Sequence, residues 1–262
     1  MKLAFIGGGV MGEAMIGGVL SNGLAKPQDI AACDILAQRR EHLTSAYGIQ
    51  AVERLAPESA QIVVLAVKPQ EFPAAARGLS LKPAQTVMSI MAGVTIQAIR
   101  TALKHDAIVR AIPNTPAQIS EGMTVWTATD AVPDADRELV RSVLAVLGQE
   151  LYVDDEKYVD MATAVSSSGP AYVFLVMEAL IDGAVHIGLR RELAQRMVIQ
   201  TILGSAKYAQ TTGKHPADLR NQVTSPAGTT TEGLLALEKA GLRRAFMEAI
   251  RAAYEKAQRL GG

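Results

Sequence analysis

The sequence predicts an α/β protein in which an open parallel sheet is followed by an all-α domain. Short β-type runs alternate with helical patterns over residues 1–155, and only helical periodicity remains over residues 156–262. The chain has 262 residues, 49% of them hydrophobic, which is enough to bury a sizeable core in one or two domains. We therefore expect two domains that meet near residue 155.

The first predicted strand leads directly into a glycine-rich turn. The apolar run at residues 2–6 is followed by GGGVMG and then by an amphipathic helical pattern over residues 13–24. In this spacing Gly7 permits a tight turn, Gly9 lets the backbone approach a pyrophosphate, and Gly12 lets helix and strand pack closely. The pattern predicts a Rossmann domain that binds a dinucleotide, against the alternative of a chance glycine-rich turn.

The second predicted strand bears on the choice of dinucleotide. Residues 30–33 are apolar and end in Asp34, about 20 residues after the glycines, where Rossmann domains place an acidic residue. A carboxylate there accepts a hydrogen bond from a free ribose 2′-hydroxyl and repels a 2′-phosphate, which favours NADH. Arg39 and Arg40 follow closely enough to offset that repulsion, so NADPH stays open.

Three more buried parallel strands are predicted, because three short apolar runs each end in turn residues. Ligands of open parallel sheets bind outside the carboxyl ends of the strands, so these turns are expected to line a cofactor crevice. The alternative for each is an ordinary strand-ending loop. The strands are 61–67, 86–91 and 107–112, and the turns are 68–69, 92–93 and 113–116.

Five helices are predicted in the second domain. Glycine or proline breaks them at Gly188, Gly213, Pro226 and Gly241. The serine-rich segment 166–170 is expected to open the first helix at Ala171, either as a cap or as a small-residue loop near a bound substrate. The helices cover residues 171–189, 192–212, 216–223, 231–240 and 243–260.

The most informative loop of this domain is TSPAGTTT, at residues 224–231. It places four hydroxyls and a run of backbone N–H groups just before a helix, where unpaired donors and partial positive charge bind a small carboxylate without an arginine. Pro226 and Gly228 shape the turn, and Gly228 allows close backbone approach. The alternative is a polar turn with a Ser/Thr helix cap.

Charge and cysteine content exclude several classes of protein. The 26 basic and 26 acidic residues cancel, so no overall field favours nucleic acid or an anionic membrane. No run of 18 uncharged apolar residues appears. The single Cys33 cannot form an intrachain disulfide and fits a reducing compartment. We expect a cytoplasmic protein without nucleic-acid or membrane partners.

No metal site is expected. Glu178, Asp182 and His186 stand four residues apart on one predicted helix and form a stripe on one face. A metal half-site is one interpretation, but no nearby motif supplies further ligands. A solvated or interface-facing polar stripe is therefore favoured.

Six segments together resemble the pyrroline-5-carboxylate reductase family over essentially the whole chain: GGGVMG, AVKPQ, SIMAGV, RAIPNTPA, SSSGPAYVF and VTSPAGTTTEGL. The resemblance implies a Rossmann domain over 1–155 and a helical dimerisation and substrate domain over 156–262. It also implies hydride transfer from NADH or NADPH to the ring C=N of 1-pyrroline-5-carboxylate, giving L-proline. Two positions depart from the family pattern, where Ala227 and Ser167 replace glycines.

The resemblance also implies the site residues. Thr230 is the catalytic hydroxyl, which orients the ring nitrogen of a cyclic imine that is basic enough to be partly protonated from solvent. Its alternative role is a simple helix cap. Substrate binding is assigned to Ser225, Gly228, Thr229 and Ser168. Cofactor binding is assigned to Ile6, Gly7, Gly8, Gly9, Val10 and Met11 at the pyrophosphate, to Asp34 at the ribose, to Ala66, Val67, Lys68, Pro69, Ala92 and Gly93 at the walls, and to Asn114 at the floor.

Two rival functions and one rival assembly remain. A dehydrogenase of β-hydroxy acids places a catalytic lysine on the first interdomain helix, but residues 158–206 contain no lysine. A non-catalytic dinucleotide-binding dimer is disfavoured by the intact Thr230 loop. The segment 171–189 is apolar around most of its circumference and needs cover, so we expect a homodimer or higher homo-oligomer. The alternative is a monomer whose helices fold back on the sheet.

Overall fold

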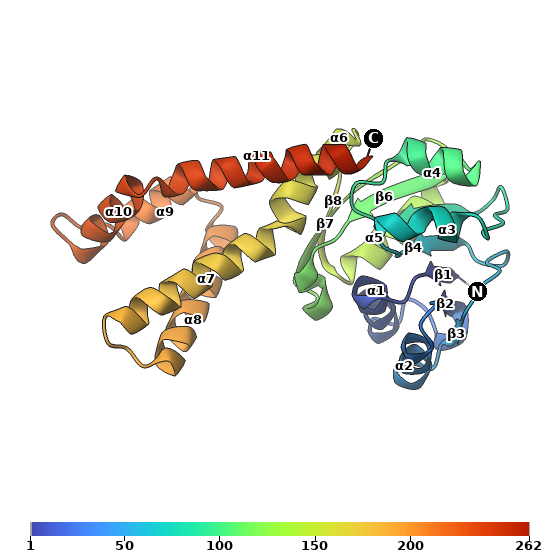
Figure 1. Ribbon diagram of the computed structural model, residues 1–262, viewed down its shortest axis with the longest axis horizontal. Coiled ribbons are helices and arrows are strands. Elements are labelled where there is room, and N and C mark those ends of the chain that lie inside the picture. The colour runs from blue at the N-terminus through green and yellow to red at the C-terminus, as the bar shows by residue number, and fades with distance from the viewer. Residues whose placement is uncertain (1, 262) are drawn as a thin grey trace. The chain divides into compact units, whose positions relative to one another are not determined.

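The computed structural model describes residues 2–261 and contains an eight-stranded sheet in the order β3-β2-β1-β4-β5-β6-β7-β8 (Figure 1). All neighbouring strands are parallel except β6 and β7. The order of the first six strands is that of a doubly wound dinucleotide-binding sheet, which confirms the predicted fold class. The strands are β1 Leu3–Ile6, β2 Ile30–Cys33, β3 Gln50–Val52, β4 Ile62–Leu65, β5 Thr86–Ser89, β6 Ile108–Ile112, β7 Gly122–Ala128 and β8 Gly148–Tyr152.

Helices cover both faces of this sheet because its buried strands are apolar on both sides. One layer contributes Met15, Ile16 and Leu43 to a core with alternate strand residues, and the other contributes Phe72 and Ile99 to a second core. The helices of the first layer are α1 Val10–Ser21, α2 Ala37–Tyr47 and α5 Asp134–Ala145, and those of the second are α3 Phe72–Ala76, α4 Ile96–Leu103 and α6 Lys157–Ala162. Three short 3₁₀ turns, η1 Pro27–Asp29, η2 Pro69–Glu71 and η3 Thr115–Ile119, complete the connections.

The helices after residue 156 follow the sequence pattern closely. Gly188, Gly213 and Gly241 all have positive φ, as residues that end helices do. The helices are α7 Gly169–His186, α8 Arg191–Thr212, α9 Pro216–Gln222, α10 Thr229–Lys239 and α11 Leu242–Gly261.

The prediction that a helix opens at Ala171 was wrong. Residues 157–186 form one continuous helical segment, interrupted at Thr163–Ser167 by a π-helical turn named η4. The amide of Ser168 donates to the carbonyl of Thr163 at 2.9 Å, five residues back, which is the bond of a π turn. The serines at 166–168 therefore widen a helix and do not cap one.

Packing divides the described chain into two compact units. The first contains residues up to Pro170 and from Ala252 onward, and the second is Ala171–Arg251. This division follows contacts within one subunit, and the sequence-based boundary near residue 155 stays a prediction.

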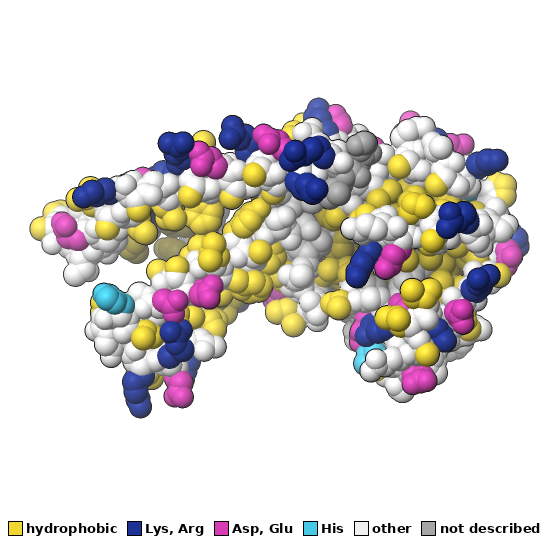
Figure 2. All heavy atoms as spheres, in the orientation of Figure 1, with side chains coloured by type: hydrophobic (Ala, Val, Ile, Leu, Met, Phe, Trp, Pro, Cys, Tyr) yellow, Lys and Arg dark blue, Asp and Glu magenta, His cyan; other side chains and the backbone are white. Residues whose placement is uncertain are grey.

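The helical unit Ala171–Arg251 buries little of its own apolar surface. Of its described residues only Ala194 is buried, while Phe174, Leu235 and Met247 are 60%, 63% and 72% exposed. Hydrophobic side chains gather along α7 (Figure 2). Contiguous apolar surface of this kind marks an interface or a membrane contact.

Candidate active site

The glycine-rich turn between β1 and α1 has the shape that a pyrophosphate requires. Gly7 has a φ of +103°, and a Cβ there would lie 2.6 Å from the carbonyl oxygen of Ala66. A Cβ on Gly12 would lie 2.8 Å from the carbonyl oxygen of Gly7, so the helix packs closely on the turn. By contrast, a Cβ on Gly9 would meet no described atom within 4 Å. The open space at Gly9, at the N-terminus of α1, fits an incoming phosphate.

Asp34 lies beside this turn and holds it. One carboxylate oxygen accepts from the amide of Gly8 at 2.9 Å and the other from the amide of Leu36 at 2.9 Å. Each oxygen keeps a second lone pair for a ribose hydroxyl. The geometry therefore fits the ribose role that the sequence predicts for Asp34.

The two arginines that follow are both engaged. Arg39 donates to the Gly8 carbonyl from Nε at 2.9 Å and pairs with Glu13 at 2.6 Å. Arg40 donates to the carbonyls of Asp34 and Ile35 at 2.9 and 3.0 Å.

Glu13 is the centre of a cluster that the sequence analysis missed. It accepts from Arg39, from His42 at 2.6 Å and from Tyr47 at 3.1 Å. Burial acts to raise the pKa of Glu13, but these hydrogen bonds and the charge of Arg39 outweigh it and lower the pKa. Burial and the neighbouring carboxylate raise the pKa of Tyr47. The cluster ties α2 to α1 and, through Arg39, to the glycine turn.

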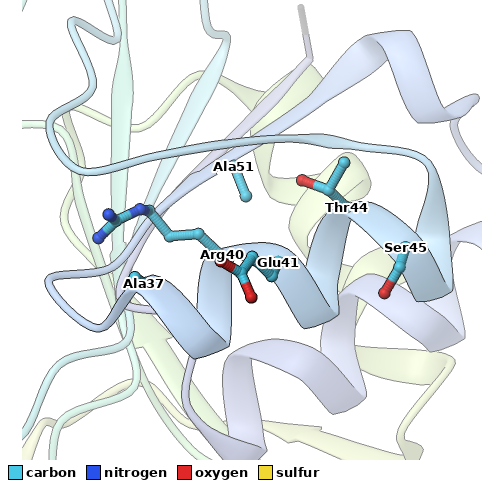
Figure 3. A pocket seen from close by; sticks show the side chains of 6 residues that line it. All are labelled: Ala37, Arg40, Glu41, Thr44, Ser45 and Ala51. Carbon is cyan, nitrogen blue, oxygen red and sulfur yellow. The ribbon is translucent and has the colours of Figure 1, made fainter.

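A hollow on α2 lies close to the Arg40 side chain (Figure 3). Arg40 extends toward the Ala37 end of the helix, and Thr44 and Ser45 lie on the following turns. None of the residues assigned to the cofactor lines the hollow, and we assign no ligand to it. Its lining is Ala37, Arg40, Glu41, Thr44, Ser45 and Ala51.

The turns predicted to wall the cofactor follow β4, β5 and β6, which are parallel, so all three leave the same edge of the sheet. Gly93 has a φ of +75° in the second of them. Asn114, in the third, donates to the carbonyl of Ser166 at 3.0 Å and accepts from the amide of Met123 at 2.9 Å. The Asn114 side chain thus connects this edge of the sheet to the π turn η4. Such π turns within helices are frequent at functional sites.

The loop at 224–231 is shaped by Gly228. A Cβ on Gly228 would lie 2.4 Å from the hydroxyl of Ser225, and the amide of Gly228 donates to the Ser225 carbonyl at 3.1 Å. Gly228 is also the N-cap of α10 and makes no side-chain cap bond, so the Ser/Thr cap considered as the alternative is absent from this helix. Thr231 closes the loop by donating to the Ser225 carbonyl at 2.9 Å.

Thr230 lies in the first turn of α10 and is half-buried. Within residues 2–261, its hydroxyl and those of Ser225 and Thr229 have no hydrogen-bond partner. Among the same residues the amides of Thr229 and Thr230 have no acceptor, as expected in the first turn of a helix, whereas the amide of Thr231 donates to the Gly228 carbonyl at 3.1 Å. The three hydroxyls and these two amides therefore remain free for a ligand, which is not what a capping role for Thr230 predicts.

Comparison with known proteins gives the family. Residues 156–260 match a model described as pyrroline-5-carboxylate reductase dimerisation, and residues 2–93 match one described as NADP oxidoreductase, coenzyme F420-dependent. A pyrroline-5-carboxylate reductase of Synechocystis is 39% identical over 270 aligned residues, covering 100% of this chain and 98% of the relative. The chain belongs to the pyrroline-5-carboxylate reductase family.

Solved structures agree with this assignment. A pyrroline-5-carboxylate reductase from Coxiella burnetii has a TM-score of 0.90 at 34% identity, with 100% of this chain and 98% of that chain covered. The Plasmodium falciparum enzyme, solved with NADP bound, has a TM-score of 0.88 at 30% identity and the same coverage. Prephenate dehydrogenase from Aquifex aeolicus, at 17% identity and a TM-score of 0.56, shares the fold alone.

Family membership bears on the apolar helical segment. By length and composition, Lys157–His186 is apolar enough to cross a membrane. A stretch of 18 residues within it has a mean hydropathy of 1.4, and 6% of that stretch is buried. The same residues lie inside the match to the dimerisation model. The match to the dimerisation model therefore favours a subunit interface as the cover for this surface.

The two departures from the family pattern have different consequences. Ala227 has a φ of +52°, a left-handed conformation that favours the glycine it replaces. Ser167 lies in the helical turn η4 and is not among the residues with positive φ, so its backbone does not require the glycine it replaces.

The polar stripe on α7 is exposed, and Asp182 pairs with Arg191 of α8 at 2.9 Å. Within residues 2–261, no group of three or more His, Cys, Asp or Glu side chains is placed to hold a metal ion.

Proposed function

We propose that this chain reduces 1-pyrroline-5-carboxylate to L-proline with a reduced nicotinamide dinucleotide. Full-length similarity to named pyrroline-5-carboxylate reductases carries the proposal. The free hydroxyls and amides at the start of α10 and the open glycine turn at Gly9 support it with chemistry suited to such a reaction.

The substrate carboxylate binds the loop before α10. Ser225 and Thr229 donate from their hydroxyls, and the amides of Thr229 and Thr230 donate from the helix N-terminus, whose partial positive charge replaces a cationic side chain. Gly228 keeps the backbone open on this side. Ser168, half-buried beside the π turn, is proposed as a further substrate contact.

Thr230 acts on the ring nitrogen. The loop at 224–231 contains no titratable side chain, so the imine takes its proton from solvent, and the hydroxyl of Thr230 orients the protonated nitrogen. Addition of one hydride to the ring carbon then breaks the C=N π bond and gives the secondary amine of proline.

The described residues fit a bound dinucleotide. The amides of residues 9–11, at the N-terminus of α1, are proposed to bind the pyrophosphate, and Asp34 the ribose. The amides of Gly7 and Gly8 donate within the protein, to the Cys33 carbonyl and to Asp34, and shape the turn. The strand-end turns at 66–69 and 92–93, with Asn114, are proposed as the walls and floor of the cofactor crevice. When bound, the reduced cofactor supplies the hydride and leaves oxidised.

NADH is the proposed preference. Asp34 presents a carboxylate at the end of β2, from which it would accept from a free 2′-hydroxyl and would repel a 2′-phosphate, so it disfavours NADPH. Arg39 is engaged by Gly8 and Glu13, and Arg40 by the carbonyls of Asp34 and Ile35. These bonds hold both guanidinium groups in place and support the NADH preference.

The active form is proposed to be a homodimer or higher homo-oligomer in the cytoplasm, built on residues 156–262. The exposed apolar side chains of α7, α8, α10 and α11 need a partner, and a symmetric second copy supplies the same surface. Sedimentation of the active protein at nanomolar concentration tests this. A fully active species of 27.8 kDa would refute it.

The activity itself is tested by following NADH and NADPH absorbance with and without 1-pyrroline-5-carboxylate. We expect oxidation only when the imine is present, with proline formed in equal amount. Folded protein that turns over neither cofactor would contradict the proposal.

A further inference from the structure

A buried guanidinium lies under the edge of the sheet from which the cofactor turns leave. Arg110, in β6, is 1% exposed and pairs with Glu156 at 2.6 Å and with Asp160 at 2.5 Å. A charge buried this deeply requires such partners. Both carboxylates belong to α6 and its N-cap, so Arg110 fixes this helix against the sheet.

Glu156 makes a second contact that Asp160 does not make. The oxygen that pairs with Arg110 also accepts from the amide of Ile96 at 2.8 Å. Ile96 is the first residue of α4, whose amides lack intrahelical acceptors. Thr95 accepts from a neighbouring amide, that of Ala98, at 3.1 Å. Glu156 therefore fixes the start of α4 from a distant part of the chain.

The turn that ends at Ile96 also packs on α6. Ala92 lies against a small core that contains Val159 and Ala162 of α6 and Ile112 of β6. Gly93 follows with its positive φ. The β5–α4 turn is thus supported by α6 at two points, one apolar and one polar.

We propose that Glu156, oriented by Arg110, is a positioning residue that holds the β5–α4 turn in the conformation against which the nicotinamide end of the cofactor binds. This inference rests on the proposed function, in which Ala92 and Gly93 form part of the wall of the cofactor crevice. Their turn follows β5, which lies on the side of β1 away from β2 and Asp34, so it faces the nicotinamide end when Asp34 binds the adenosine ribose. Loss of Glu156 lets the turn move and weakens binding of the nicotinamide end. Binding of the adenosine end, at the glycine turn and Asp34, is unaffected.

The chain offers a matched control. Glu156→Ala and Asp160→Ala each remove one carboxylate from Arg110, but only the first removes the acceptor of the Ile96 amide. Glu156→Gln keeps an oxygen that accepts from Ile96. Ile96→Pro removes the amide hydrogen at a helical position that tolerates proline, after a Thr95 whose backbone is already extended, and leaves the ion pairs intact.

The experiment compares two ligands on the full-length enzyme by calorimetry: NADH, and ADP-ribose, which lacks the nicotinamide. We expect Glu156→Ala and Ile96→Pro to raise the Kd for NADH about 10-fold, as for loss of a hydrogen bond to a charged acceptor, with that for ADP-ribose changed less than about 2-fold. Asp160→Ala and Glu156→Gln should leave the ratio of the two constants near that of wild type. Should Glu156→Ala fail to fold, Ile96→Pro carries the test.

Equal weakening of both ligands, or the same ratio change in Asp160→Ala, would overturn the inference. So would wild-type protein that binds NADH no better than ADP-ribose. Turnover of the imine by wild type is a separate measurement. If wild type does not turn over the imine but the variants show the expected Kd values for NADH and ADP-ribose, the proposed reaction is contradicted and the role of Glu156 stands.

Discussion

Replacing Ala227 with glycine is predicted to stabilise the protein. Ala227 has a φ of +52° in the loop before α10, and this left-handed conformation costs an L-residue about 1–2 kcal/mol. Glycine adopts it without strain but loses about 0.4–1 kcal/mol more backbone entropy on folding. The net gain in the free energy of unfolding is therefore about 0.5–1 kcal/mol.

Thermal unfolding at fixed protein concentration measures this gain. A change of that size raises the Tm of a chain of this length by about 1–4 °C. Ala236→Gly is the matched control, because Ala236 lies inside α10, where the same removal of a methyl group costs about 0.5–1 kcal/mol. The two substitutions should shift the Tm in opposite directions. If Ala227→Gly lowers the Tm as Ala236→Gly does, the strain inferred for this loop is wrong.

Substitutions at three further residues test the cofactor and substrate sites and the cluster beside the glycine turn. Thr230→Ala should lower turnover about 10- to 1,000-fold through loss of one transition-state hydrogen bond, while Thr230→Ser should keep much of the turnover. Equal rates for Thr230→Ala and wild type would leave Thr230 without a catalytic role. Asp34→Ser should shift the ratio of kcat/KM values toward NADPH by about 1–3 kcal/mol, and an unchanged ratio would assign the preference to other residues. Because the pKa of Glu13 is lowered in the folded state, its stabilisation is present above its unfolded pKa of about 4.3 and is lost as the pH falls through the lower folded value. The stability gap between wild type and Glu13→Gln should therefore narrow as the pH falls below about 4, and a constant gap in urea unfolding would contradict this.

Hydrophobic patterning was enough to predict the doubly wound sheet and the helices after it. Buried parallel strands such as Ile62–Leu65 are continuous apolar runs, and helix ends such as Gly213 have a backbone that glycine favours. The strands β3, β7 and β8 were not anticipated. β3 has only three residues, and β7 and β8 mix polar with apolar residues near one edge of the sheet, so neither forms a continuous run.

The contacts around the site were less visible from sequence. Arg110 falls inside the predicted buried strand 107–112, but its partners Glu156 and Asp160 are 46 and 50 residues away and look like ordinary surface charges until the fold brings them to it. The π turn was read as a helix start because serine and Gly-Pro favour caps, whereas here the helix continues through them. Ala227, by contrast, was marked in advance by its departure from the family pattern, and its positive φ gives the physical reason.

The most direct measurement of the central proposal follows the hydride. Reduced cofactor carrying deuterium at the transferable position is incubated with the enzyme and 1-pyrroline-5-carboxylate, and the proline is analysed by mass spectrometry. We predict that one deuterium appears on the ring carbon of the former C=N bond, in equal amount to the cofactor oxidised, and that Thr230→Ala slows its appearance. Proline without deuterium, or cofactor oxidation without proline, would contradict direct hydride transfer by this chain.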